Sequence, residues 1–310
     1  MKEITYGQAL SEAVQEEMAR DPNVVYLGEC AGGRYGDRSF EMPISESGFT
    51  GIGVGAAIAG LRPIVEIMFC DFVTVAMDPI VNQAAKIHYM FGGMASVPIV
   101  VRAPFGAYVS MSAQHSQSLE SWFSGVPGLK VVTPSTPYDV KGLMKSAIRD
   151  DNPVIFCDHK RLRGLTGQVP EGDYVVPIGQ ATVVRPGNDA TIVTYAFMTQ
   201  KSLEAAEQLE KHDIHVEVVD LRTTLPIDEE AILNSVGKTG RLVTVAEACA
   251  PCSVASEVAA LVMEKGFDLL KAPLRRVHAK FAPIPFAKTL EDHLLPQTED
   301  IVAAVRDVLE

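Results

Sequence analysis

Pro63-Ile64-Val65-Glu66-Ile67-Met68 is a short, almost wholly apolar run that follows the turn residues Gly60-Leu61-Arg62. Val24-Val25-Tyr26-Leu27-Gly28 and Val97-Pro98-Ile99-Val100-Val101-Arg102 have the same character. Continuous apolar runs of this length are typical of strands that are buried on both faces of a parallel sheet. We therefore expect three buried parallel strands in the first part of the chain.

Helical segments lie between and beyond these runs. Residues 10–20 are charged and helical in pattern, and apolar or small residues recur at helical spacing from Asp78 to Tyr89 and from Tyr138 to Arg149. Strands that alternate with helices favour a mostly parallel sheet covered on both faces. The predicted fold class for this half is therefore doubly wound α/β.

Glycine and proline repeatedly interrupt the pattern between Lys160 and Pro186. Beyond them the alternation resumes, with expected strands at 190–195, 216–220 and 241–245 and an expected helix at 201–211. We predict two doubly wound domains, residues 1–175 and 187–310, joined by a linker at 176–186.

The composition limits the classes of partner. The chain has 310 residues, a net charge of -12 and 47% hydrophobic residues. Phosphate binding needs an excess of Lys and Arg, so neither nucleic acid nor an anionic membrane is expected as a partner. No transmembrane run, signal peptide or Arg-rich leader is visible, and we expect a cytoplasmic protein.

Two local motifs invite interpretations that their context does not support. Gly51-Ile52-Gly53-Val54-Gly55-Ala56 matches a dinucleotide-binding fingerprint, with Asp71 further on, but no buried strand precedes it. We expect instead a helix over about residues 50–60 whose small residues let another backbone approach closely. Cys249 and Cys252 have redox spacing, but the five cysteines are odd in number and scattered, so we interpret this pair as structural.

Three positions are candidates for chemistry, each with a plain structural alternative. Glu46 lies before the glycine-rich helix, where it is either a site carboxylate or a charge favoured by the helix dipole. His115 follows a loop at the carboxyl end of a predicted strand, where α/β proteins bind ligands, or is an ordinary loop histidine. The helix end at residues 147–153 offers oxygen ligands for a hard cation, or is a solvated turn.

The chain resembles, over nearly its whole length, the β subunits of the decarboxylating first component (E1) of 2-oxo acid dehydrogenase complexes. Tyr89-Met90-Phe91-Gly92-Gly93 and Leu290-Glu291-Asp292 are most similar to acetoin dehydrogenase β subunits, with pyruvate and branched-chain relatives next. The resemblance rests on an ordered series of strings: Pro43-Ile44-Ser45-Glu46, Gly60-Leu61-Arg62-Pro63, Gln83-Ala84-Ala85-Lys86, His115-Ser116-Gln117-Ser118, Pro127-Gly128-Leu129-Lys130-Val131-Val132, Lys141-Gly142-Leu143, Ala147-Ile148-Arg149-Asp150 and Asp220-Leu221-Arg222-Thr223.

This resemblance implies a transketolase-like pyrimidine-binding domain, a transketolase C-terminal-like domain and a thiamine diphosphate cofactor. Glu46 matches the glutamate that hydrogen-bonds the aminopyrimidine ring, Phe72 the aromatic residue that stacks on it, and Ile44 an apolar wall of the pocket. His115 matches an active-site histidine that handles intermediates or acyl transfer. A structural monovalent cation, K+, is implied at Ile99, Ala147, Ile148, Asp150 and Asn152.

The implied chemistry explains why a carboxylate is needed. A carboxylate bonded to the pyrimidine favours its imino tautomer, which takes the proton from the thiazolium carbon and creates the nucleophile. That carbon attacks a carbonyl, and the ring accepts the electrons released on C–C cleavage.

No Gly-Asp-Gly occurs in the chain, although the family uses this motif to hold magnesium and the diphosphate. The resemblance therefore implies an α subunit that supplies the motif, in an α2β2 assembly, and a lipoyl acyltransferase core as a further partner.

Two departures from the family bear on substrate and assembly. The family has a longer glycine-rich segment where only Cys30 to Met42 stands here, and Lys280-Phe281-Ala282-Pro283 replaces a pattern with Asp before the proline. The substrate and the docking to a core are therefore open. An acyloin-forming or two-chain transketolase-like enzyme without a lipoyl partner, and a non-catalytic scaffold subunit, are the alternatives.

Overall fold

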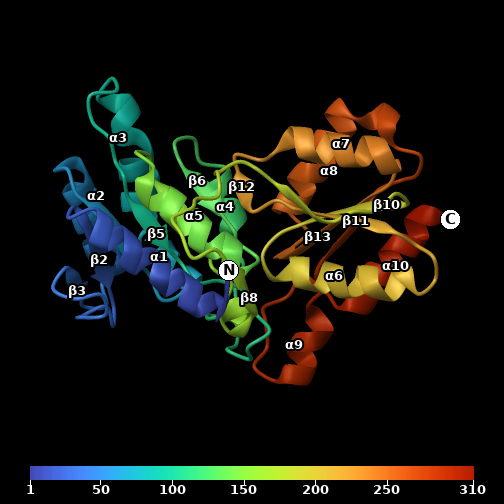
Figure 1. Cartoon of the computed structure of the whole chain (residues 1–310), viewed down its shortest axis with the longest axis horizontal. Coiled ribbons are helices and arrows are strands. Elements are labelled where there is room, and N and C mark those ends of the chain that lie inside the picture. Colours follow the sequence, from blue (N-terminus) through green and yellow to red (C-terminus); the bar gives the residue numbers. More distant parts are fainter. The chain divides into compact units, whose positions relative to one another are not determined.

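The chain packs as two compact units in the computed structural model, which describes residues 1–310 (Figure 1). The first unit contains residues 1–105 and 122–178, and the second contains residues 106–121 and 179–310. Each unit is built on a mainly parallel sheet with helices, which confirms the predicted fold class. The excursion 106–121, which carries His115, belongs to the second unit although the residues on both sides of it belong to the first. That residues 1–175 and 187–310 are separate domains, joined by a linker at 176–186, stays a prediction.

The first unit has a parallel sheet in the order β6-β7-β5-β4-β2-β3. The predicted strand at 24–28 is observed without change, whereas those at 63–68 and 97–102 are shorter than expected. The elements are β1 (Lys2–Thr5), α1 (Tyr6–Arg20), β2 (Val24–Gly28), β3 (Ser39–Glu41), α2 (Glu46–Ile58), β4 (Arg62–Glu66), α3 (Ala85–Met90), β5 (Val100–Arg102), α4 (Glu120–Ser124), β6 (Lys130–Val132), α5 (Pro137–Arg149), β7 (Val154–Phe156) and β8 (Thr166–Val169).

Local sequence explains where the two helices that pack against each other begin. The Thr5 hydroxyl accepts a hydrogen bond from the backbone N–H of Gln8, and the Gln8 side chain accepts one from the backbone N–H of Thr5. α1 therefore starts with a capping box. Thr136 caps α5, with Pro137 at its first position. α1 and α5 pack side by side, and Lys141 of α5 is buried there against Glu12 and Glu16.

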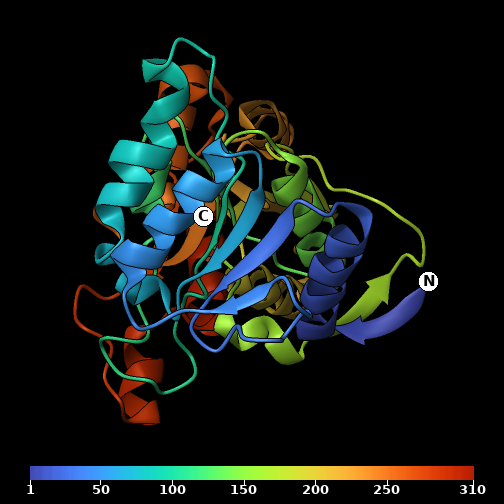
Figure 2. The same ribbon diagram turned by 90° about the vertical axis from the view of Figure 1, so that its left-hand side faces the viewer.

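Two predicted segments differ from the observed elements. The helix expected at 78–89 is a wider π-helical turn at Asp78–Ala84 followed by α3, which together keep Ile80, Ala84 and Ile87 buried. The interrupted stretch after Lys160 is partly regular, because β8 pairs antiparallel with β1 near the N-terminus (Figure 2). Pairing with a strand more than 150 residues away is invisible to local sequence patterns.

The second unit is a three-layer arrangement around a sheet in the order β14-β13-β10-β11-β9. Only β9 runs antiparallel to its neighbour. α6 and α10 pack together on one face of the sheet, and α7 and α8 on the other (Figure 1). The elements are β9 (Thr182–Arg185), β10 (Ala190–Thr194), α6 (Phe197–Glu210), β11 (Val216–Asp220), β12 (Thr223–Leu225), α7 (Glu229–Thr239), β13 (Leu242–Cys249), α8 (Val254–Lys265), β14 (Arg275–Ala279), α9 (Lys288–Leu294) and α10 (Thr298–Leu309).

Candidate cofactor site

Glu46 is the first residue of α2, directly after the turn that contains Pro43 and Ser45. Only 7% of its surface is exposed, and its carboxylate forms no hydrogen bond or ion pair with any residue of the chain. The helix N-terminus favours a negative charge, but a buried carboxylate without a partner is costly. Glu46 is therefore suited to a hydrogen-bond donor that comes from outside the chain.

A second carboxylate lies near Glu46 and has no counterpart among the residues expected from the sequence. Glu29 directly follows β2, and burial, followed by the nearby charge of Glu46, raises its pKa. Its buried Oε1 atom has no hydrogen-bond partner. The sequence signal was a glutamate at the carboxyl end of a buried strand, which is where ligands bind in parallel sheets.

The two apolar residues expected around the pyrimidine differ in exposure. Ile44 lies in the turn before α2 and is 82% exposed, so within this chain it does not form a closed wall. Phe72 is half-buried in a 3₁₀ helix at Cys70–Thr74, which follows β4. Ile44 and Glu46 thus lie on either side of Ser45 at the start of α2. The ring of Phe72 is partly accessible.

Four of the five residues expected at a cation site, Ala147, Ile148, Asp150 and Asn152, lie at the end of α5 or just beyond it, and Ile99 directly precedes β5. The carbonyl oxygens of Ile148 and Asp150 each accept a hydrogen bond of 3.0 Å from one Arg62 nitrogen. The Ile99 carbonyl accepts from the Val154 amide at 2.9 Å. These carbonyl groups therefore already have protein donors, although each keeps a second lone pair for a cation.

The Asp150 side chain is also engaged. One of its oxygens pairs with Lys130, and the other accepts hydrogen bonds from the backbone and side chain of Asn152. Burial raises the pKa of Asp150, but the Lys130 and Asn152 hydrogen bonds outweigh it and leave the pKa lowered. Arg62 and Lys130 are two cationic groups that the sequence-based site did not include.

His115 is half-buried and lies in the second unit, whereas Glu46 lies in the first. Its backbone N–H donates to the carbonyl of Ser112 at 3.2 Å, in a turn near the end of the excursion. No regular secondary structure holds residues 106–119. The backbone around His115 is therefore held by tertiary contacts and not by a helix or a strand.

The glycine-rich motif has a structural role, whereas the structural interpretation of the cysteine pair stays a prediction. Gly51 to Ala56 lie inside α2, not at a turn between a strand and a helix, so they cannot cradle a dinucleotide phosphate. A Cβ at Gly53 would meet the side chains of Val65 and Ile99, which corrects our expectation that another backbone approaches there. Cys249 and Cys252 are free thiols.

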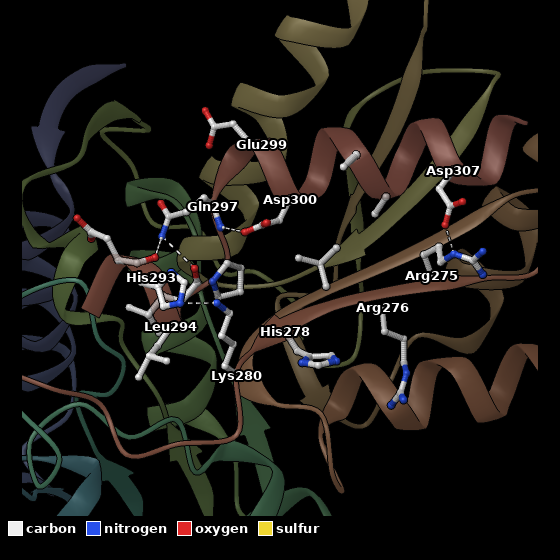
Figure 3. A pocket seen from close by; sticks show the side chains of 16 residues that line it. Arg275, Arg276, His278, Lys280, His293, Leu294, Gln297, Glu299, Asp300 and Asp307 are labelled. Carbon is white, nitrogen blue, oxygen red and sulfur yellow. Dashed lines mark hydrogen bonds and ion pairs between the residues drawn. The ribbon is translucent and has the colours of Figure 1, made fainter. Parts of the chain in front are cut away.

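A hollow of the second unit is unrelated to these residues. It measures about 810 Å³ and lies between the end of β14 and helices α9 and α10 (Figure 3). Lys280 donates to the His293 ring at 2.8 Å, and Arg275 pairs with Asp307 inside it (Figure 3). None of the residues expected to bind the cofactor lines this hollow.

Comparison with known proteins assigns both units. Residues 2–164 match the transketolase pyrimidine-binding domain, and residues 179–301 match the transketolase C-terminal domain. The acetoin:2,6-dichlorophenolindophenol oxidoreductase β subunit of Cupriavidus necator is 47% identical over all of this chain and 98% of its own length. The 2-oxoisovalerate dehydrogenase β subunit of Bacillus subtilis is 43% identical over the full length of both.

The chain belongs to the family of 2-oxo acid dehydrogenase E1 β subunits. The resemblance described from the sequence motifs is thereby confirmed. A solved structure titled split gene transketolase, inactive β4 tetramer, covers 99% of the chain with a TM-score of 0.82 at 26% identity, which confirms the transketolase-like architecture.

The two relatives named above are longer than this chain between their matched ends. The alignment with the Cupriavidus relative spans 332 positions although it contains all 310 residues here, so this chain lacks residues that the relative has. The segment 30–42 before α2 is where we predict this difference to lie. It is folded, because the Glu41 carboxylate accepts hydrogen bonds from the Cys30 and Gly32 amides at 3.0 and 2.7 Å.

Proposed function

We propose that this chain is the catalytic β subunit of a thiamine-diphosphate-dependent E1 component that acts on acetoin or a 2-oxo acid. It would cleave a C–C bond next to a carbonyl and pass the acyl or aldehyde unit to a lipoyl carrier. The observation that carries this proposal is Glu46, a nearly buried carboxylate at the start of α2 that no residue of the chain satisfies.

The residues of this chain fit the aminopyrimidine half of the cofactor. Glu46 would accept a hydrogen bond from the aminopyrimidine ring and hold its proton, and the half-buried ring of Phe72 would stack on it. Ile44, exposed in this chain, would complete the apolar wall once another surface covers it. When bound, thiamine diphosphate supplies the electron sink for C–C cleavage.

The diphosphate half of the cofactor would need a second chain. Because Gly-Asp-Gly is missing, magnesium and the diphosphate would be held by an α subunit, in an α2β2 assembly. Exposed apolar side chains support such a partner, since large apolar patches mark interaction sites. We call the cluster at the end of α3, which contains Tyr89, Met90, Phe91 and Met94, the α3 patch.

A K+ ion would be held at the end of α5 by the carbonyl oxygens of Ala147, Ile148 and Asp150, with Ile99 and Asn152 nearby. The oxygen-rich surroundings suit a hard cation. Arg62 would share these oxygens with the ion, because its guanidinium already donates to two of them.

His115 would handle the acyl unit on its way to the lipoyl carrier, as a donor or acceptor of a proton. None of the helices has the length and apolar character needed to cross a membrane. We propose a cytoplasmic enzyme, and a lipoyl acyltransferase core as its further partner.

The variant Glu46→Gln tests the catalytic assignment in the co-expressed α and β chains with thiamine diphosphate and magnesium. We expect dye-coupled turnover to fall by a factor of roughly 100 or more, because an amide cannot hold the pyrimidine proton as a carboxylate does. Glu229→Gln is the matched control, because Glu229 is likewise the first residue of a helix. Unchanged turnover in Glu46→Gln would contradict the proposal and favour a scaffold subunit.

A substrate panel separates the leading function from the alternative. Pyruvate, branched 2-oxo acids and acetoin would be offered with a dye acceptor and, in parallel, with a lipoyl domain. Reductive acylation of the lipoyl domain supports the E1 function. Carboligation with no lipoyl transfer supports the acyloin-forming alternative, for which the likeness to a split transketolase is the favouring observation.

A further inference from the structure

The excursion that carries His115 contains three residues with an unfavourable backbone conformation. Tyr108, Ser110 and Ser112 have φ angles of 63°, 54° and 67°, all in the left-handed region. Each such non-glycine residue costs about 1 kcal/mol or more. A loop with three of them keeps this conformation only if surrounding groups hold it.

Glu247 of β13 holds the two ends of the excursion together. Its Oε1 atom accepts a hydrogen bond from the backbone N–H of Ala107 at 2.6 Å and another from the Ser118 hydroxyl at 2.9 Å. The side chain is buried, so water does not compete effectively for these bonds. One carboxylate oxygen thus joins residue 107 to residue 118 and closes the loop.

Glu291 of α9 holds the middle of the excursion. Both of its carboxylate oxygens lie 3.1 Å from the backbone nitrogen of Ser110, and Oε2 also accepts from the Ser110 hydroxyl at 3.1 Å. Glu291 is fully buried. It therefore fixes Ser110, one of the left-handed residues, through a charge-assisted hydrogen bond.

One further hydrogen bond and several apolar contacts hold the excursion next to these carboxylates. The Tyr108 hydroxyl donates to the Pro296 carbonyl at 2.6 Å, and its ring packs edge-on against Phe197. Ala107 belongs to a small buried cluster with Ala279, Ile284 and Leu295.

We infer that Glu247 and Glu291 are positioning residues for His115, which act by holding residues 106–119 of the excursion in a strained conformation. This inference rests on the proposed function in one respect, namely that His115 acts in the reaction. Neither glutamate touches the substrate in this account. Their two carboxylates come from a strand and a helix more than 120 residues further along the chain.

The first test measures the loop itself, without reference to catalysis. Glu247→Gln and Glu291→Gln would be introduced into the assembled α and β chains, and hydrogen–deuterium exchange of residues 106–119 would be followed. We expect faster exchange there and unchanged exchange in β10 and β11. Glu217→Gln is the control, since Glu217 is a buried carboxylate of the same sheet that binds Ser235 and Lys238 and does not touch the excursion. Unchanged exchange in both variants would overturn the inference.

The second test asks whether the glutamates act through His115. We expect Glu291→Gln to lower kcat roughly 10- to 100-fold, as expected for a small misplacement of a catalytic group, with little change in the affinity for thiamine diphosphate. In a His115→Ala background the same substitution should have little further effect, because the pair is coupled. Glu291→Asp should recover part of the rate.

The outcomes separate the two claims. If His115→Ala leaves turnover unchanged, the catalytic role of His115 fails, while faster exchange in the glutamate variants still supports their hold on the loop. If the effects of His115→Ala and Glu291→Gln on kcat are fully additive, the positioning role is contradicted.

Discussion

Buried carboxylates occur at several positions of this chain, and their surroundings give them different roles. Glu17 and Glu66 are neutralised by arginine partners. Glu46 has no partner in the chain, and Glu247 and Glu291 bind backbone and serine donors of the excursion. All of these residues are glutamates, so their neighbours decide whether each carboxylate has a structural or a chemical role.

Glu120 is a buried carboxylate whose pKa is raised. Burial raises its pKa to about 7, and Tyr195 donates a hydrogen bond to its Oε1 atom at 2.6 Å. In an unfolded chain the group titrates near 4.5. The folded protein therefore keeps a proton that the unfolded chain releases between these two pH values, so the contribution to stability falls across this window and is lost above it.

The variant Glu120→Gln is predicted to remove this dependence. Between pH 5 and pH 8 the parent chain should lose roughly 3 kcal/mol of stability from this group, and the variant should not. The melting temperature of Glu120→Gln should consequently exceed that of the parent at pH 8 and match it near pH 5. Thermal unfolding at both pH values measures this, with the exposed pair member Glu229→Gln as the control. Parallel pH profiles of parent and variant would show the assignment to be wrong.

At the scale of elements, α2 is a glycine-rich helix whose glycines are not equivalent. A Cβ at Gly53 would lie 2.5 Å from Val65 Cγ2 and 3.1 Å from Ile99 Cδ1, so the helix packs closely on the sheet there. Gly55 has open space around its position. The contact at Gly53 fixes the distance of α2 from β4 and therefore the placement of Glu46 at the start of the helix.

Two alanine substitutions in α2 should have opposite effects on the isolated β chain. Gly53→Ala should destabilise it by about 1 to 3 kcal/mol through overpacking. Gly55→Ala should stabilise it by up to about 1 kcal/mol, because alanine has the better helix propensity and meets no atom. Urea unfolding followed by circular dichroism measures both. A stabilising Gly53→Ala would show that this contact is looser than the structure implies.

At the scale of the whole molecule, the exposed apolar groups and the missing diphosphate motif both indicate an incomplete enzyme. Tyr89, Met90 and Met94 of the α3 patch are exposed by three quarters or more. A surface of this kind on a free monomer favours association. Our proposal is that a second chain, which also supplies Gly-Asp-Gly, covers this patch.

Met94→Glu is predicted to weaken the association with the α subunit. A charge in an apolar interface would be buried without a partner, which costs several kcal/mol. Light scattering after size-exclusion chromatography of the co-expressed chains should show a loss of heterotetramer. Met263→Glu is the control, because Met263 is exposed on α8, outside the α3 patch. An intact heterotetramer in Met94→Glu would place the α interface elsewhere.

Much of the fold could be predicted because its signals are local. The apolar run 24–28 and the helix from Pro137 to Arg149 carry their own periodicity and caps, and they were predicted to within a residue. The pairing of β1 with β8 and the π-helical turn could not be predicted, since both depend on distant neighbours. At the site, motif likeness named Glu46 and His115. Glu29 had only its place after the buried strand 24–28 as a signal, and no local pattern distinguished Glu247 or Glu291.

The α/β class and the likeness to E1 β subunits follow from the amino-acid sequence alone, because apolar periodicity and ordered motifs are local features of the chain. The missing Gly-Asp-Gly, which supports our proposal of a second chain, is likewise a feature of the sequence. Only the tertiary structure decided that Glu46 is buried without a partner and that the His115 excursion packs with the second unit. Burial and long-range hydrogen bonds arise when residues that are far apart in the sequence meet. That information exists only after the chain has folded.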